Sequence, residues 1–122
     1  MNDLSTILKR YEAAWNELDP KQRLSFLDRC WAESGVYTDP GVQTHSRQAL
    51  SDNIGAFLAA TPGHALRVVS GVDEHHRQVR FEWKLLDTGG AVALAGMSCG
   101  LLGEDELIER MTGFFGPFPS AI

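Results

Sequence analysis

The sequence contains few cysteines and no excess of basic residues. Its two cysteines show no CxxC spacing and cannot form a disulfide framework, so we expect free thiols, Cys30 in a helix and Cys99 in a strand. Charged residues make up 22% of the chain and the net charge is -5, which leaves no basic stripe that could neutralise phosphates. These features argue against nucleic acid as a partner.

Long apolar runs are also missing. The longest, such as residues 91–95, fall far short of the roughly 20 residues that span a bilayer. The acidic start Met1-Asn2-Asp3 lacks the basic segment of a signal peptide. We therefore expect a cytoplasmic protein that does not bind membranes.

The sequence shows no motif for a bound nucleotide or metal ion. It has no Gly-x-Gly-x-x-Gly, no Walker-type loop and no nucleophile elbow. His75 and His76 are adjacent, so in an extended chain they point to opposite faces and cannot chelate one ion. We expect no cofactor and no metal.

Helical patterns fill the first half of the chain. Apolar residues at three- and four-residue spacing predict a first helix, with Asp3 or Ser5 as its cap, over Leu4, Ile7, Leu8, Tyr11, Trp15 and Leu18. Asp19-Pro20 begins a second helix that continues through Leu24, Leu27 and Trp31 to a stop at Ser34-Gly35. Ser46 caps a third helix with Leu50, Ile54, Phe57 and Leu58 on its apolar face.

Strand patterns fill the second half. After a short strand at 35–39 that Pro40 terminates, and a polar loop, four strands are expected at hairpin spacing over 64–73, 79–86, 91–102 and 107–115. Gly96 and Gly100 share a face with Ser98, where missing side chains permit a sharp bend. With 43% hydrophobic residues in 122, we predict a single α+β domain over residues 1–122, in which a cone-shaped, curved antiparallel sheet wraps around N-terminal helices and encloses an apolar cavity.

Five short motifs carry a family resemblance. They are Arg10-Tyr11-Glu12 to Asp19, Trp31 to Asp39-Pro40, Phe81-Glu82-Trp83, Gly96-Met97-Ser98 and Gly113-Phe114-Phe115-Gly116. Together they span the chain and are similar to the nuclear transport factor 2-like superfamily, most of all to its SnoaL-like polyketide cyclase and ketosteroid isomerase branch. The resemblance implies the cone-shaped fold, and it implies an activity less directly because enzymes and non-enzymes share these motifs.

The resemblance also implies site residues. In the isomerase, the Asp of an Asp-Pro at the end of the first strand moves a proton next to a ketone, and Asp39 matches that position. A first-helix tyrosine donates to the enolate oxygen, and Tyr11 matches it. The isomerase's second donor is a protonated Asp where this chain has Ser98, which is a weaker donor. At most one of His75 and His76, and by preference His76, is expected to face the cavity and serve as a second acid or base, as histidines do in related dehydratases.

Each of these residues also has a structural interpretation. Asp39 is a routine turn former before proline, Tyr11 lies in the apolar stripe of its helix, and Ser98 is small enough to let the sheet bend. His76 fits a solvated turn. The leading hypothesis is a cofactor-independent isomerase or cyclase-like enzyme acting on a small hydrophobic carbonyl compound, and the alternative is a non-catalytic ligand-binding or dimerisation module.

Large aromatic residues are expected to line the cavity and contact the ligand. They are Trp15, Trp31, Phe57, Trp83 and Phe115. In the strand at 79–86, apolar and charged residues alternate, so one sheet face is buried and the other is wet or at an interface. We expect a homodimer formed through that outer face.

Overall fold

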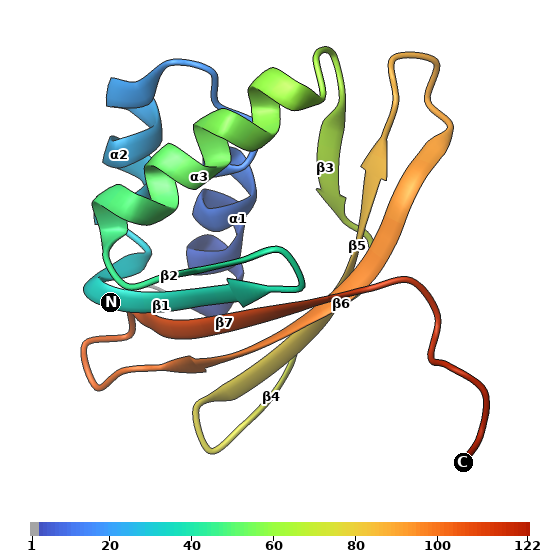
Figure 1. Ribbon diagram of the computed structural model, residues 1–122. Coiled ribbons are helices and arrows are strands. Elements are labelled where there is room, and N and C mark those ends of the chain that lie inside the picture. The colour runs from blue at the N-terminus through green and yellow to red at the C-terminus, as the bar shows by residue number, and fades with distance from the viewer. Residues whose placement is uncertain (1–2) are drawn as a thin grey trace.

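The computed structural model describes residues 3–122, and in it three helices lie on the concave side of one strongly curved sheet (Figure 1). Met1 and Asn2, part of the acidic start discussed above, lie outside the described residues. Across residues 3–122, every helix is too short or too polar to cross a bilayer. In chain order the elements are α1 (Leu4–Ala14), α2 (Pro20–Asp28), β1 (Trp31–Asp39), β2 (Val42–Thr44), α3 (Arg47–Ala60), β3 (Ala65–Val68), β4 (Asp73–His75), β5 (Gln78–Leu86), β6 (Val92–Leu102) and β7 (Ile108–Phe115).

The sheet is mixed and does not close into a barrel. Its strand order is β2-β1-β7-β6-β5-β3, and β4 pairs with β5. All pairs are antiparallel except β1 with β7, which run parallel. The long connection through α3 and β3–β6 permits this, since parallel neighbours cannot be joined by a tight hairpin. The expected α+β fold with a curved sheet over helices is confirmed, but the expectation of a purely antiparallel sheet was wrong.

The predicted helix starts are confirmed by side-chain caps. Asp3 accepts a hydrogen bond from the Thr6 backbone at 2.7 Å, and Ser46 accepts one from the Ala49 backbone at 3.0 Å. Asp19 caps α2 directly before Pro20 at the first helical position. Each cap satisfies an amide that the helix itself leaves without a partner.

The first helix is shorter than expected. It ends at Ala14, and Leu18 is 75% exposed instead of sharing the buried stripe. The Asn16 side chain donates to the carbonyls of Glu12 and Leu66, and its oxygen accepts from the Leu66 amide. These bonds tie the end of α1 to β3, so the chain leaves the helix there.

The second helix is also shorter than expected. It ends at Asp28, and Trp31 begins β1 opposite Ile108 instead of continuing the helix. Cys30 lies between α2 and β1, so its expected helical position was wrong. Trp31 is fully buried, and the three- to four-residue spacing that suggested a helix reflects only that it faces the same core.

Two other segments differ from expectation because short strands pair at the sheet edges. Residues 42–44, expected in a polar loop, pair with β1 as β2. The single strand expected over 64–73 is divided into β3 and β4, which pair with different parts of β5. The core lies between the helices and the sheet region of Val79, Ile108 and Met111.

Two glycines in β6 let large side chains approach the strand. A Cβ at Gly96 would overlap the Phe114 carbonyl oxygen and the Trp83 indole, and a Cβ at Gly100 would lie 2.9 Å from the Met111 sulfur. The indole of Trp83 therefore packs directly against the backbone of β6.

We expect Gly96→Ala to lower the free energy of unfolding by about 3 kcal/mol, because a methyl group has no room between Phe114 and Trp83. Urea unfolding followed by circular dichroism measures this change. Gly71→Ala is the matched control, since no atom lies within 4 Å of a Cβ there. Equal stabilities of the two variants would contradict the close packing at Gly96.

Candidate functional site

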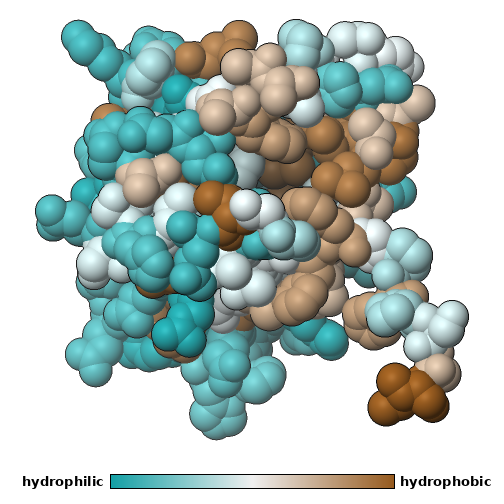
Figure 2. Space-filling view, in the orientation of Figure 1, coloured by the Kyte–Doolittle hydropathy of each residue, from teal (hydrophilic) through white to brown (hydrophobic). Residues whose placement is uncertain are grey.

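A cavity of about 410 Å³ opens between α1, α3 and the concave side of the sheet. Figure 2 shows hydrophobic side chains gathered around a hollow between α3 and the strands. Its apolar wall includes Phe57, Leu66, Phe81, Trp83, Leu94 and Phe115. A cavity of this size and character suits a small hydrophobic molecule.

Polar groups gather at one end of this cavity, in a row across the sheet. Ser98 lies opposite Gly113 on β7 and opposite Phe81 on β5. Asp39 lies next to Gly113 on the other side, since the parallel register pairs Thr38 with Thr112. The row places a carboxylate and a hydroxyl on either side of a glycine.

Asp39 is held by hydrogen bonds to both of its carboxylate oxygens. The Tyr37 hydroxyl donates to Oδ2 at 2.8 Å, and the Gly41 backbone amide donates to Oδ1 at 2.8 Å. Tyr37 reaches Asp39 because residues two apart in a strand share a face. Pro40 ends the strand and turns the Gly41 amide back toward the carboxylate. The carboxylate orientation is fixed, and each oxygen keeps a lone pair for another donor.

Ser98 is 6% exposed and accepts a hydrogen bond from the Trp83 indole nitrogen at 3.1 Å. Among the described residues its own hydroxyl proton has no acceptor. Because the indole can only donate, that proton must point elsewhere, and Ser98 lines the cavity. Ser98 is therefore available as a hydrogen-bond donor to a ligand.

Tyr11 is held in a stack of aromatic rings. Its ring lies parallel to that of Trp31, with centroids 5.7 Å apart, and edge-on to Trp15 at 6.3 Å. Burial raises the pKa of Tyr11 well above its usual value, while the Trp15 side chain lowers it by less, and the charges of Cys30 and Asp39 raise it slightly. Tyr11 thus stays a neutral phenol that can donate.

Two further buried groups that can lose a proton, the Tyr37 phenol and the Cys30 thiol, lie near Tyr11. Burial raises the pKa of Tyr37 well above its usual value, and the neighbouring Tyr11 and Asp39 raise it further. Burial also raises the pKa of the Cys30 thiol to about 12, although Arg10 and Arg47 lower it slightly. Both groups stay protonated near neutral pH.

The structure brings together three of the four catalytic candidates. Asp39, Tyr11 and Ser98 all line the cavity. Four of the five expected ligand-contacting aromatics line it as well, namely Trp15, Phe57, Trp83 and Phe115.

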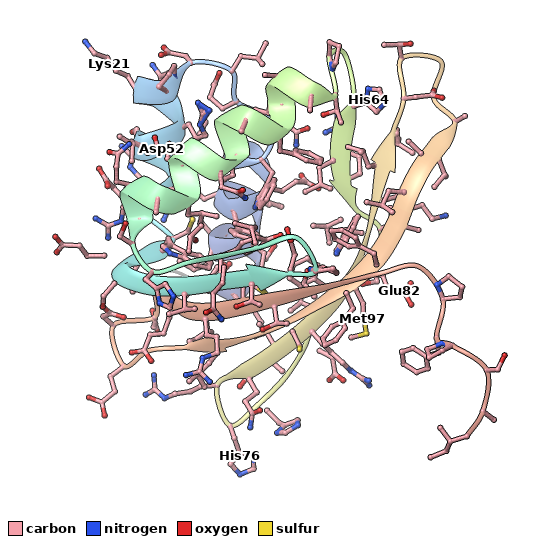
Figure 3. The ribbon with its side chains drawn as sticks, viewed as in Figure 1. Lys21, Asp52, His64, His76, Glu82 and Met97 are labelled. Carbon is pink, nitrogen blue, oxygen red and sulfur yellow. The ribbon has the colours of Figure 1, made fainter. Side chains whose placement is uncertain are left out.

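Trp31 and His76 do not belong to the cavity, which corrects two expectations. Trp31 is fully buried behind Tyr11, where it supports that ring. His76 lies exposed at the β4–β5 turn, far from the helices (Figure 3). His76 and Arg77 both have positive φ there, and this tight turn directs the side chains into solvent.

Sequence reasoning missed two polar residues of the cavity. Tyr37, the donor to Asp39, could have been found because it shares a strand face with Asp39. Asn53 lines the cavity from α3, one turn before Phe57 on the same helix face. A polar residue within an apolar stripe was the available signal.

Across residues 3–122, no three side chains of the types that bind metals come together. The ring nitrogens of His75 and His76 lie 3.2 Å apart at the exposed turn, without a third ligand. The groups that face the cavity are a carboxylate, hydroxyls and an amide, which suit proton transfer and hydrogen bonding to a carbonyl or hydroxyl.

Comparison with known families identifies a match over most of the chain. The sequence profile of the SnoaL-like domain matches residues 8–111. A proposed isomerase of the SnoaL-like family from Agrobacterium tumefaciens has 30% identity and a TM-score of 0.86, over 92% of this chain and 96% of that chain. No curated protein matches the sequence.

More distant solved structures share the fold. A proposed polyketide cyclase from Sinorhizobium meliloti has 14% identity and a TM-score of 0.69, covering 88% of this chain and 92% of that chain. A cystatin-like protein of unknown function from Methylobium petroleophilum has 16% identity and a TM-score of 0.74, over 97% of this chain and 79% of that chain. At these identities the likeness concerns the fold alone.

We expect stability to fall as the pH rises above about 9. Burial raises the pKa values of three groups in the folded chain, Tyr11, Tyr37 and Cys30. As the pH rises, the unfolded chain therefore loses these protons at a lower pH than the folded chain does. Above about pH 10, each tyrosine removes about 1.4 kcal/mol of stability per pH unit. Urea unfolding at pH 8 to 11 measures how the free energy of unfolding changes with pH. In Tyr37→Phe the slope above about pH 10 should be smaller by about 1.4 kcal/mol per pH unit, because only one buried tyrosine remains. Phenolate absorbance at 295 nm appearing near pH 10 in the folded protein would contradict the burial.

Proposed function

Because the chain belongs to the SnoaL-like family, we propose that it is a cofactor-independent enzyme of isomerase or cyclase type. Its substrate is a small hydrophobic carbonyl compound that binds in the cavity. The observation that carries the proposal is the Asp39 carboxylate, fixed by two hydrogen bonds at the polar end of an otherwise apolar space. The Agrobacterium tumefaciens relative, itself named as a proposed isomerase, supports this reaction type.

Asp39 is the general base in this proposal. One of its oxygens takes the proton from the carbon next to the carbonyl, and the electrons of that C–H bond form the C=C bond of an enolate. The hydrogen bonds from Tyr37 and Gly41 hold the carboxylate in place during this step, so Tyr37 is a positioning residue. In a substrate with a C=C bond next to that carbon the enolate is a dienolate, and Asp39 returns the proton to the far end of the dienolate, which moves the C=C bond and completes an isomerisation.

Tyr11 and Ser98 supply donors for the negative charge that develops on the carbonyl oxygen. The raised pKa of Tyr11 keeps its proton in place, and the Ser98 proton is free of other acceptors among the described residues. The apolar walls exclude water, so a hydrogen bond to the oxyanion is stronger than it would be in solvent.

A non-catalytic ligand-binding or dimerisation module is the second candidate. One observation favours it: both Asp39 oxygens already have a partner in the chain, as a purely structural turn would require. Such a module would bind apolar molecules in the cavity without moving a proton.

We predict that Asp39→Asn lowers deuterium incorporation next to the carbonyl of 2-tetralone by at least about 100-fold, because an amide cannot accept the proton. Proton NMR in D₂O measures the exchange at equal protein concentrations. Asp52→Asn is the matched control, since Asp52 is exposed on α3 and lies outside the cavity lining (Figure 3). Exchange that is absent in the parent, or unchanged in Asp39→Asn, would favour the binding module.

We also propose that two copies of the chain pair through the outer face of the sheet. Val92 and Phe114 are 52% and 53% exposed, and Met97 and Glu82 point away from the helices on the same face (Figure 3). The exposed apolar side chains of Val92 and Phe114 on this otherwise mixed face would be stabilised by a partner surface.

Light scattering at micromolar concentration should give twice the 13.4 kDa chain mass. Phe114→Glu should shift the mass toward that of the monomer, because it places a charge in the interface. Glu104→Gln, in the exposed loop before β7, is a control that should leave the dimer unchanged. A parent protein that is monomeric under these conditions would contradict the dimer.

A further inference from the structure

Two histidines meet at the exposed turn between β4 and β5. The Nδ1 atoms of His75 and His76 lie 3.2 Å apart, and the two rings are edge-on with their centroids 5.4 Å apart. Both side chains are exposed, and His76 points away from the helices (Figure 3). Neither histidine lines the cavity, so the pair is separate from the candidate site.

The backbone of the turn brings the two rings to one side. Neighbouring side chains point to opposite faces only where the chain is extended. His76 and Arg77 form the two-residue loop between His75 and Gln78, and their φ values are 51° and 65°. Two successive positive φ values are typical of a tight hairpin turn, and they take His76 out of the extended conformation. The two imidazoles can therefore face one another.

Neighbouring groups hold this turn in its strained conformation. Residues other than glycine rarely adopt positive φ, and Arg77 does so at the turn position where glycine is preferred. The Arg77 carbonyl oxygen accepts from the Leu102 amide at 2.8 Å, and its guanidinium donates to the Gly103 carbonyl at 2.7 Å. The Arg77 amide donates to the Glu74 carboxylate at 3.1 Å. Because these bonds fix the backbone below both imidazoles, a ligand that binds them loses less free energy to ordering.

The facing Nδ1 atoms require a positive centre between them. A neutral imidazole has a proton on one ring nitrogen and a lone pair on the other, and two lone pairs 3.2 Å apart repel. Either a shared proton or a metal ion removes that repulsion. Two nitrogens bound to a tetrahedral zinc ion at about 2.0–2.1 Å are about 3.3–3.4 Å apart, whereas a square arrangement places them about 2.9 Å apart. The observed separation is closer to the tetrahedral value.

We propose that His75 and His76 bind one zinc ion through their Nδ1 atoms. The ion replaces the proton that otherwise joins the two rings, and that proton is released to solvent. Both rings are exposed, so they can rotate to direct their lone pairs at the ion. Within residues 3–122 no third side chain of a metal-binding type joins the pair, so water completes the coordination. The net charge of -5 favours binding of a cation.

Isothermal titration calorimetry with zinc chloride tests the site at about pH 7.5, where an ordinary imidazole is mostly neutral. The parent protein should bind one ion per chain. His75→Gln and His76→Gln should each weaken zinc binding by at least about tenfold, because a single imidazole loses the second, intramolecular bond. An affinity within twofold of the parent in either variant would overturn the site.

His45→Gln is the matched control for the loss of one surface imidazole. His45 is exposed and follows β2, which lies at the opposite edge of the sheet from β5 and β3. This variant should keep the zinc affinity within twofold of the parent, and a loss equal to that of His76→Gln would overturn chelation by the pair. Magnesium chloride is the control ion, since magnesium prefers oxygen ligands. Magnesium binding as tight as that of zinc would contradict ligation by imidazole.

Long-range proton–nitrogen NMR identifies the nitrogen atoms that bind the ion. Zinc should shift the Nδ1 resonances of both His75 and His76 and leave a proton on each Nε2. Coordination through Nε2 of either ring would overturn the assigned geometry. The pair lies outside the cavity, so these outcomes do not depend on whether Asp39 transfers a proton.

Discussion

The candidate site depends on a carboxylate that is held in place without a cation. Asp39 takes hydrogen bonds from a phenol and a backbone amide, and the ion pairs of the described residues involve other carboxylates, Asp28 and Asp73. A neighbouring arginine would stabilise the charged form strongly and make the carboxylate a weaker base. Here two neutral donors orient the carboxylate at the edge of the cavity, as a base beside an apolar substrate requires.

The aromatic residues around this carboxylate keep its surroundings neutral. Trp31 supports Tyr11 from behind, and Trp15 packs between Tyr37 and Phe57, with ring centroids 5.3 and 5.5 Å away. Burial in this cluster raises the pKa values of both tyrosines, so neither phenol becomes a competing anion near Asp39. The same packing that stabilises the core therefore fixes the protonation states at the site.

Local patterns were sufficient to predict the helix caps, the curved sheet and the elements that carry Asp39, Tyr11 and Ser98, because each depends on neighbours in sequence. Trp31 was misassigned because a buried strand start and a helix face give the same apolar spacing. The parallel pairing of β1 with β7 depends on contacts between distant segments, and so does the position of Gly113 between Asp39 and Ser98. The cytoplasmic location and the homodimer stay predictions.

Hydroxyl groups that face the cavity distinguish it from a plain core. Buried polar groups are normally paired, since an unpaired one costs roughly 1 to 3 kcal/mol. Among the described residues, buried groups without a partner also lie in the core at Arg23, Trp31 and Thr44. Tyr11 and Ser98 instead line the cavity, and the Ser98 oxygen already accepts from the Trp83 indole. Phenylalanine would preserve the ring packing of Tyr11, whereas alanine at position 98 would leave the Trp83 indole without its acceptor. A ligand bound in the cavity would supply the acceptor that the Ser98 proton lacks, and this is the physical link between the fold and the proposed function.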